Sequence, residues 1–119
     1  MHELSIADAV VATACRYADG RRVVRVELKV GHLRQVVPSA LELAFELVAH
    51  GTAVEGAELV IEEVPARVVC RECAAESRVA EFPLACAGCG SLIVDVVGGE
   101  ELLVDALELE DEPVAVARR

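Results

Sequence analysis

The chain has 119 residues, of which 55% are hydrophobic but only 3% aromatic, so its core has to be aliphatic. A formal net charge of −10 disfavours nucleic acid, whose binding depends on neutralising phosphates, and favours protein partners or metal cations. The length predicts one compact unit or two small ones, and no apolar stretch reaches the length of a membrane span. We therefore expect neither nucleic acid nor a membrane among the partners.

The first predicted element is a helix that begins at Ser5 and ends before Gly20. Ser5 and Asp8 form a variant of the capping box, in which polar side chains satisfy the first helical N–H groups. Apolar residues then recur at helical spacing up to Tyr17, and Gly20 is suited to the position after the last turn. Residues 1–4 are expected to form a short arm outside the helix.

A strand–helix–strand unit is predicted next. Residues 23–30 alternate between apolar and charged side chains, which is typical of a half-buried strand. The predicted inner face of this strand comprises Val24, Val26, Leu28 and Val30. A second helix starts at Pro38, since proline is tolerated in a first turn, and closes at Gly51. Residues 58–64 form the second strand, and the connection is long enough for a right-handed parallel crossover.

The last predicted strand, residues 101–110, returns to the same sheet after an insertion. The expected fold class is α+β: a small mixed three-stranded sheet with two helices, and a zinc-ribbon subdomain inserted before the last strand. The domain boundaries follow from this order. Residues 1–64 and 98–119 form a discontinuous α/β domain, and residues 65–97 form the zinc-binding subdomain.

Four of the five cysteines lie in this insertion as two Cys-x-x-Cys pairs, Cys70/Cys73 and Cys86/Cys89. Each pair supplies two adjacent corners of a tetrahedron, so the two together predict a structural zinc site with no open position. A disulfide or redox pair is less consistent with two matched pairs, whereas a rubredoxin-like iron site stays an alternative. Metal-binding thiols, an unpaired Cys15 and the lack of a secretory signal indicate a cytoplasmic location.

The residues Met1, His2 and Glu3 are a second candidate metal site. The α-amine of Met1, the next peptide nitrogen and the imidazole of His2 can form fused chelate rings, which favour Ni²⁺ or Cu²⁺ over Zn²⁺. Glu3 adds an oxygen donor or only attracts the cation. From the residues alone an idle, solvated histidine is the more frequent case, so this site stays open. His32 and His50 are not expected to be ligands.

Several segments resemble the HypA/HybF family. They are residues 1–5 (MHELS), residues 31–38 (GHLRQVVP), residues 61–65 (IEEVP) and the paired Cys-x-x-Cys motifs. The resemblance extends to about residue 110. It implies a nickel metallochaperone of [NiFe]-hydrogenase maturation, with His2 as the essential nickel ligand, assisted by the Met1 amine and Glu3.

The resemblance also implies structural zinc on the four cysteines, and as partners a maturation GTPase and the hydrogenase large subunit. Some members have a carboxylate just before the second helix that assists nickel. Residues 36–38 read VVP here, so this contribution is either absent or comes from elsewhere, with Glu42 as the candidate. No nucleophile pair, phosphate loop or convergent acid pair is visible, so we expect no enzyme. The alternative function is a zinc-ribbon adaptor between proteins, without nickel.

Overall fold

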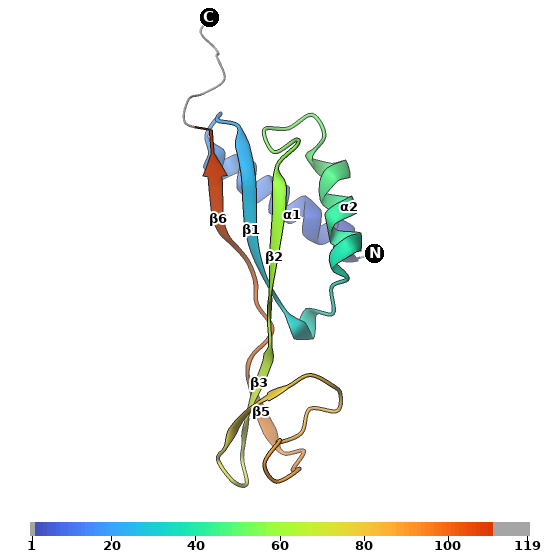
Figure 1. The fold of residues 1–119 in the computed structure, drawn as a ribbon, viewed down its shortest axis with the longest axis vertical. Helices are drawn as coiled ribbons and strands as arrows, with labels where there is room; N and C mark the ends of the chain where they lie inside the picture. Colours follow the sequence, from blue (N-terminus) through green and yellow to red (C-terminus); the bar gives the residue numbers. More distant parts are fainter. Residues whose placement is uncertain (1, 111–119) are drawn as a thin grey trace, which may run out of the picture. The chain divides into compact units, whose positions relative to one another are not determined.

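The computed structural model describes residues 2–110 (Figure 1). In chain order its elements are α1 (His2–Ala18), β1 (Val23–Gly31), the 3-10 turn η1 (His32–Arg34), α2 (Pro38–Ala49), β2 (Glu58–Val64), β3 (Ala66–Cys70), β4 (Glu76–Val79), β5 (Val94–Gly98) and β6 (Leu102–Leu109). The strands form two three-stranded sheets, ordered β2-β1-β6 and β4-β3-β5. Among these residues no helix has both the length and the apolar character needed to span a bilayer.

The described chain divides into two compact units. The first unit contains residues 2–28, 36–62 and 103–110, and the second contains residues 29–35 and 63–102. The first therefore holds both helices, whereas the second holds the sheet β4-β3-β5 and all four paired cysteines.

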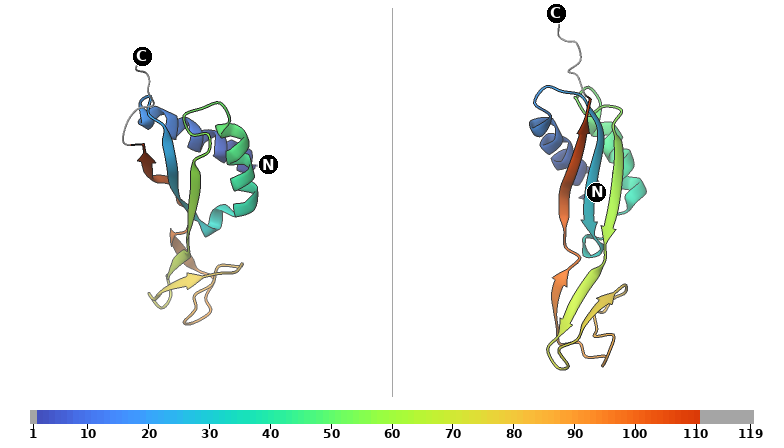
Figure 2. Two further views of the ribbon diagram at one scale, coloured as in Figure 1. Left: turned by 45° about the horizontal axis from the view of Figure 1, so that its top comes forward. Right: turned by 60° about the vertical axis from the view of Figure 1, so that its left-hand side comes forward.

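The sheet of the first unit is mixed, because β1 and β2 run in the same direction and β6 runs opposite to them (Figures 1 and 2). Both helices lie on one face of this sheet, and α1 also packs against α2. The core between helices and sheet is aliphatic apart from one aromatic ring: Ile6, Ala7, Val10, Val11, Ala14, Ala18, Val23, Val26, Leu28, Leu41, Ala44, Phe45, Ala49 and Val54. The predicted fold class is confirmed.

One detail of β1 was predicted wrongly. Val24 is exposed and Val23 is buried, although Val26, Leu28 and Val30 are buried as expected. Val23 and Val26 are thus both buried although they lie three positions apart, so the strict alternation predicted from the sequence does not hold at the start of the strand.

The start of α1 also differs from the prediction. The helix begins at His2 and not at Ser5, so His2 and Glu3 belong to its first turn and residues 2–4 are not an arm outside it. The physical reason is a long-range contact: the Glu3 carboxylate accepts a hydrogen bond from the Val37 backbone N–H (3.1 Å), which holds the first turn in place. At the other end Tyr17 is exposed rather than part of the core.

In the second unit β3 is the central strand and pairs antiparallel with β4 and with β5. Neither β3 nor β4 was expected from the sequence. The buried side chains of this unit include Val30, Ala66, Val68, Cys70 and Cys86. That is little apolar area for independent folding.

The same unit contains a close backbone crossing that requires glycine. A Cβ atom on Gly31 would lie 2.1 Å from the Gly99 carbonyl oxygen, and a Cβ on Gly99 would lie 2.6 Å from the Ala66 Cα. The Leu33 N–H donates to this Gly99 oxygen at 2.8 Å. The loop after β1 is therefore bonded directly to the segment between β5 and β6.

Candidate metal centres

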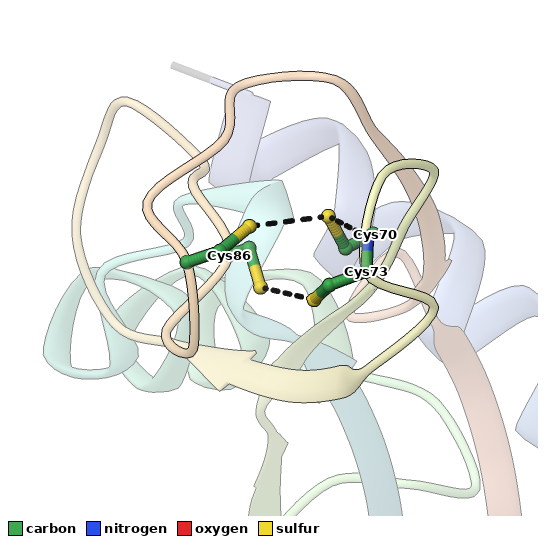
Figure 3. A group of neighbouring side chains, drawn as sticks. Cys70, Cys73 and Cys86 are labelled. Carbon is green, nitrogen blue, oxygen red and sulfur yellow. Dashed lines mark hydrogen bonds between the residues drawn. The ribbon is translucent and has the colours of Figure 1, made fainter.

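The four paired cysteines converge in the second unit. Figure 3 labels three of them, Cys70, Cys73 and Cys86. Cys70 is the last residue of β3 and Cys73 lies in the turn that follows, while Cys86 and Cys89 come from the segment between β4 and β5. Their sulfur atoms all lie within 4.8 Å of one another. In each pair the first cysteine is buried and the second is exposed. The structure thus brings together every zinc ligand that the sequence predicted.

The spacing of the sulfur atoms fits a tetrahedral ion. Zinc–thiolate bonds of about 2.3 Å in a tetrahedron place the sulfurs roughly 3.8 Å apart. The distance from the Cys70 to the Cys89 sulfur is 3.7 Å, and from the Cys73 to the Cys86 sulfur it is 3.6 Å. The cluster is therefore already shaped for such an ion.

The first pair lies in a compact turn formed by residues 70–75. The Cys70 N–H donates to the Ala75 carbonyl (2.9 Å), and the Ala74 N–H donates to the Cys70 carbonyl (3.0 Å). Two further N–H groups, of Glu72 and Cys73, donate to the Cys70 sulfur at 3.3 Å. Donors aimed at the sulfur favour the thiolate, which is the form that binds metal.

The second pair repeats this arrangement in residues 86–91. The Cys86 N–H donates to the Ser91 carbonyl (2.9 Å), and the Gly90 N–H donates to the Cys86 carbonyl (2.9 Å). The Gly88 N–H donates to the Cys86 sulfur at 3.3 Å. We call residues 70–75 and 86–91 the first and second cysteine turns. Their common hydrogen-bond pattern places the corresponding sulfurs of the two turns, Cys70 with Cys86 and Cys73 with Cys89, in equivalent positions.

The electrostatics of the cluster favour a dication. Hydrogen bonds from the Cys89 and Gly88 backbone N–H groups lower the pKa of Cys86 to about 6. The pKa of Cys89 rises to about 12, because the neighbouring cysteine sulfurs outweigh the lowering effect of the Ser91 N–H. Close thiolates cannot all carry their charge unless a cation compensates it. A bound divalent metal supplies that compensation and displaces the remaining protons.

Polar contacts attach both cysteine turns to the sheet of this unit. Arg71 forms a bidentate ion pair with Asp95 of β5, at 3.0 Å from its Nε and 2.9 Å from its Nη2, which lowers the pKa of Asp95. Ser77 of β4 accepts a hydrogen bond from the Ala87 N–H at 3.2 Å. The turns are thereby fixed to opposite edge strands.

The proposed nickel residues lie in the first turn of α1. The His2 imidazole is exposed, and its Nδ1 is 3.9 Å from the Glu3 carboxylate. The Glu3 side chain is buried, with the residue only 8% exposed, and the hydrogen bond from the Val37 N–H is the largest of several effects that lower its pKa to about 2. Met1 lies outside the described residues. Sequence reasoning missed the contact between Glu3 and Val37, because nothing local to either residue indicates it.

The other candidate residues are engaged elsewhere or point outward. The His32 Nε2 lies 3.0 Å from the Ala80 carbonyl oxygen, and the His50 Nδ1 lies 3.2 Å from the Glu55 carboxylate. Glu42 is exposed on α2. None of these contacts resembles a metal-ligand set.

Comparison with known proteins gives consistent results. A sequence model of the family described as "Hydrogenase/urease nickel incorporation, metallochaperone, hypA" matches residues 1–109. The chain is 46% identical over 110 residues to the hydrogenase maturation factor HypA of Geotalea uraniireducens, covering 92% of this chain and 100% of that protein. It is 41% identical over 111 residues to the hydrogenase maturation factor HypA of a Nostoc species, covering 93% and 97%. The solution structure of the Ni metallochaperone HypA from Helicobacter pylori matches with a TM-score of 0.66 at 23% identity, covering 92% of this chain and 98% of that one.

Proposed function

The chain belongs to the HypA family of nickel metallochaperones, which are maturation factors and not enzymes, and from this we propose that it binds Ni²⁺ at its N-terminus and delivers it for [NiFe]-hydrogenase maturation. The observation that carries the proposal is the family match over residues 1–109. The partners that follow are a maturation GTPase and the hydrogenase large subunit.

The nickel ligands in this proposal are the Met1 amine, the backbone nitrogen of residue 2 and the His2 imidazole. The first four N–H groups of a helix have no partner within the helix, and α1 begins at His2. The His2 peptide nitrogen is therefore not needed for the helix. A carboxylate 3.9 Å from the imidazole adds a favourable negative charge beside the cation.

We assign Glu3 chiefly to positioning in this site. One carboxylate oxygen accepts the Val37 N–H, which ties the first turn of α1 to the residue that precedes α2. A carboxylate held in this way would orient the imidazole of the neighbouring His2. The other oxygen is the one near the His2 ring.

Zinc is the proposed resident ion of the four cysteines. Cys70, Cys73, Cys86 and Cys89 would supply all four ligands, so the ion would have no open position for a substrate. Its contribution would be structural, joining the two cysteine turns that otherwise have few buried side chains between them.

The proposal is tested by titrating Ni²⁺ into the tag-free, zinc-loaded protein and into its His2→Ala variant. We expect the tight nickel site to be lost in His2→Ala, with zinc content unchanged. His50→Ala is the matched control, because His50 is exposed and paired with a glutamate just as His2 is. Equal nickel affinity of wild type and His2→Ala would contradict the proposal and favour a zinc-ribbon adaptor.

A further inference from the structure

The outer face of α2 carries two exposed leucines. Leu43 is 59% exposed and Leu47 is 65% exposed, and they lie one helical turn apart. The opposite face of the same helix buries Leu41, Ala44 and Phe45 in the core. Leu43 and Leu47 are therefore mostly exposed to solvent and form an apolar stripe along this face of the helix.

A groove adjoins this stripe at the C-terminal end of α2. It has a volume of about 570 Å³, within the range of roughly 300–1,000 Å³ that is usual for binding sites. The exposed Leu47 lines one side, the buried or half-buried Phe45, Ala49 and Ala57 form the apolar base, and the exposed Glu46 and Glu55 supply acidic groups. The groove extends the stripe into a depression that can receive an apolar side chain.

Along α2 the charges beside the stripe are all acidic, whereas at the groove the Arg22 guanidinium donates to the Glu55 backbone carbonyl oxygen at 2.7 Å. Glu42 and Glu46 are exposed and lie beside Leu43 and Leu47 in sequence, and α2 contains no lysine or arginine. Within residues 2–110 neither acid forms an ion pair, whereas Glu55 is partly compensated by His50 at 3.2 Å. The surface is thus an apolar stripe bordered by uncompensated carboxylates.

We propose that this surface, formed by Leu43, Leu47, Glu42, Glu46 and the adjoining groove and here called the α2 surface, docks a basic amphipathic helix of a partner protein. Such a helix would place apolar residues at i, i+3 or i+4, and i+7 along the stripe and groove. Its lysines or arginines would meet the glutamates, which increases both the rate of association and the selectivity for this partner.

Charge argues against the other occupants. A second copy of this chain, related by a two-fold axis, would bring Glu42 and Glu46 against the same residues of its mate. Phosphates of nucleic acid and anionic lipid headgroups would meet the same repulsion. The docking proposal does not depend on nickel binding, so either can fail without the other.

The probe for the test is a synthetic amphipathic peptide of leucine and lysine, about four helical turns long. A second peptide of identical composition has its leucines scattered around the helix, because an acidic protein attracts any basic peptide. Fluorescence anisotropy gives the affinities with the full-length, zinc-loaded protein, and amide chemical shifts map the site. We expect the striped peptide to bind at least about tenfold more tightly than the scattered one and to shift signals of α2 and residues 55–57.

The decisive variant is Leu43→Gln together with Leu47→Gln, which should weaken the striped peptide about tenfold or more. Leu92→Gln is the matched control, since Leu92 is 64% exposed but lies in the second unit; its effect should stay within about twofold. Circular dichroism confirms folding, which these exposed positions should not alter.

Charge reversal supplies an independent test. Glu42→Lys with Glu46→Lys should reverse the preference, so that a striped leucine–glutamate peptide binds better than the leucine–lysine one. Equal affinity of the two leucine–lysine peptides, or shifts mapped away from α2, would overturn the proposal. So would a wild-type dimer in sedimentation that the double glutamine variant dissociates, because the occupant would then be a second copy.

Discussion

Ala74 and Gly90 hold the same position in the two cysteine turns, and both have a left-handed backbone, with φ of 67° and 81°. Glycine adopts this conformation freely, whereas a residue with a Cβ pays about 1 kcal/mol. Nothing lies within 4 Å of a Cβ built on Gly90, so only the backbone conformation matters there. The first turn is therefore the more strained of the two.

This asymmetry predicts different effects of two substitutions on zinc binding. Gly90→Ala should weaken zinc binding by about 1 kcal/mol, or roughly fivefold, because the metal-bound turn requires the left-handed conformation. Ala74→Gly should be neutral or strengthen binding, since relief of strain competes with the greater freedom of the unfolded glycine. Competition with a chromophoric chelator measures both. A loss of affinity in Ala74→Gly as large as that in Gly90→Ala would contradict the assignment.

Two substitutions of Glu3 distinguish a positioning role from a role as a nickel ligand. Glu3→Gln keeps an oxygen that accepts the Val37 N–H, whereas Glu3→Ala leaves this donor without the bond. If Glu3 is a positioning residue, Glu3→Ala should lower Tm by several degrees and weaken nickel binding. Glu3→Gln should change both Tm and nickel affinity only slightly. Nickel binding that is lost equally in both variants would instead make the carboxylate a ligand.

At the scale of elements, the glycine crossing in the second unit joins segments distant in sequence. Gly31 has φ of −70°, which any residue can adopt, so its requirement for glycine comes from the approach of the Gly99 carbonyl alone. Gly20 is the opposite case, with φ of 84° and no atom within 4 Å of a Cβ. Glycine is therefore required at position 31 for steric reasons and is favoured at position 20 by the backbone conformation.

Gly31→Ala is expected to destabilise the protein by about 2–3 kcal/mol, because a backbone carbonyl cannot turn away as a side chain would. Gly20→Ala, the control, should cost only about 1 kcal/mol. Urea denaturation followed by circular dichroism measures both, and amide exchange should show faster exchange near Leu33 in Gly31→Ala. Equal costs for the two variants would mean that the crossing relaxes easily.

Elements with strong local patterns were predictable from the sequence, and those stabilised by distant contacts were not. The alternation of residues 23–30 and the first-turn Pro38 predicted β1 and α2, and both exist. The first turn of α1 depends on a partner 34 residues away, so the local capping signal at Ser5 was misleading. β3 and β4 span only five and four residues, which is too short for a periodic pattern to emerge.

The cysteine cluster follows the same rule. Spacing alone was sufficient to group Cys70, Cys73, Cys86 and Cys89, because each Cys-x-x-Cys turn fixes two sulfurs locally. The left-handed backbone of Ala74 and the close crossing at Gly31 could not be predicted. The first depends on how the cysteine turn closes, and the second depends on how segments distant in sequence meet.

At the scale of the whole molecule, the two units differ in what stabilises them. The first has an aliphatic core between helices and sheet, whereas the buried side chains of the second include two of the cysteines themselves. We therefore expect Cys86→Ala to unfold residues 66–97 and to leave α1, α2 and β1 largely intact. Hydrogen exchange followed by mass spectrometry tests this. Slow exchange that persists in residues 70–89 of the variant would show that the second unit folds without its metal.

The alternation of buried and exposed cysteines affects the rate at which a bound ion can leave, which is a separate quantity from its affinity. Cys70 and Cys86 are buried, and Cys73 and Cys89 are exposed, one of each in either turn. An incoming chelator or oxidant first meets a solvent-facing sulfur, and the shielded sulfurs of both turns still hold the ion after that bond is broken. Exchange of the metal must then proceed through partly detached intermediates, so the ion can be kinetically retained even where a competitor is thermodynamically favoured.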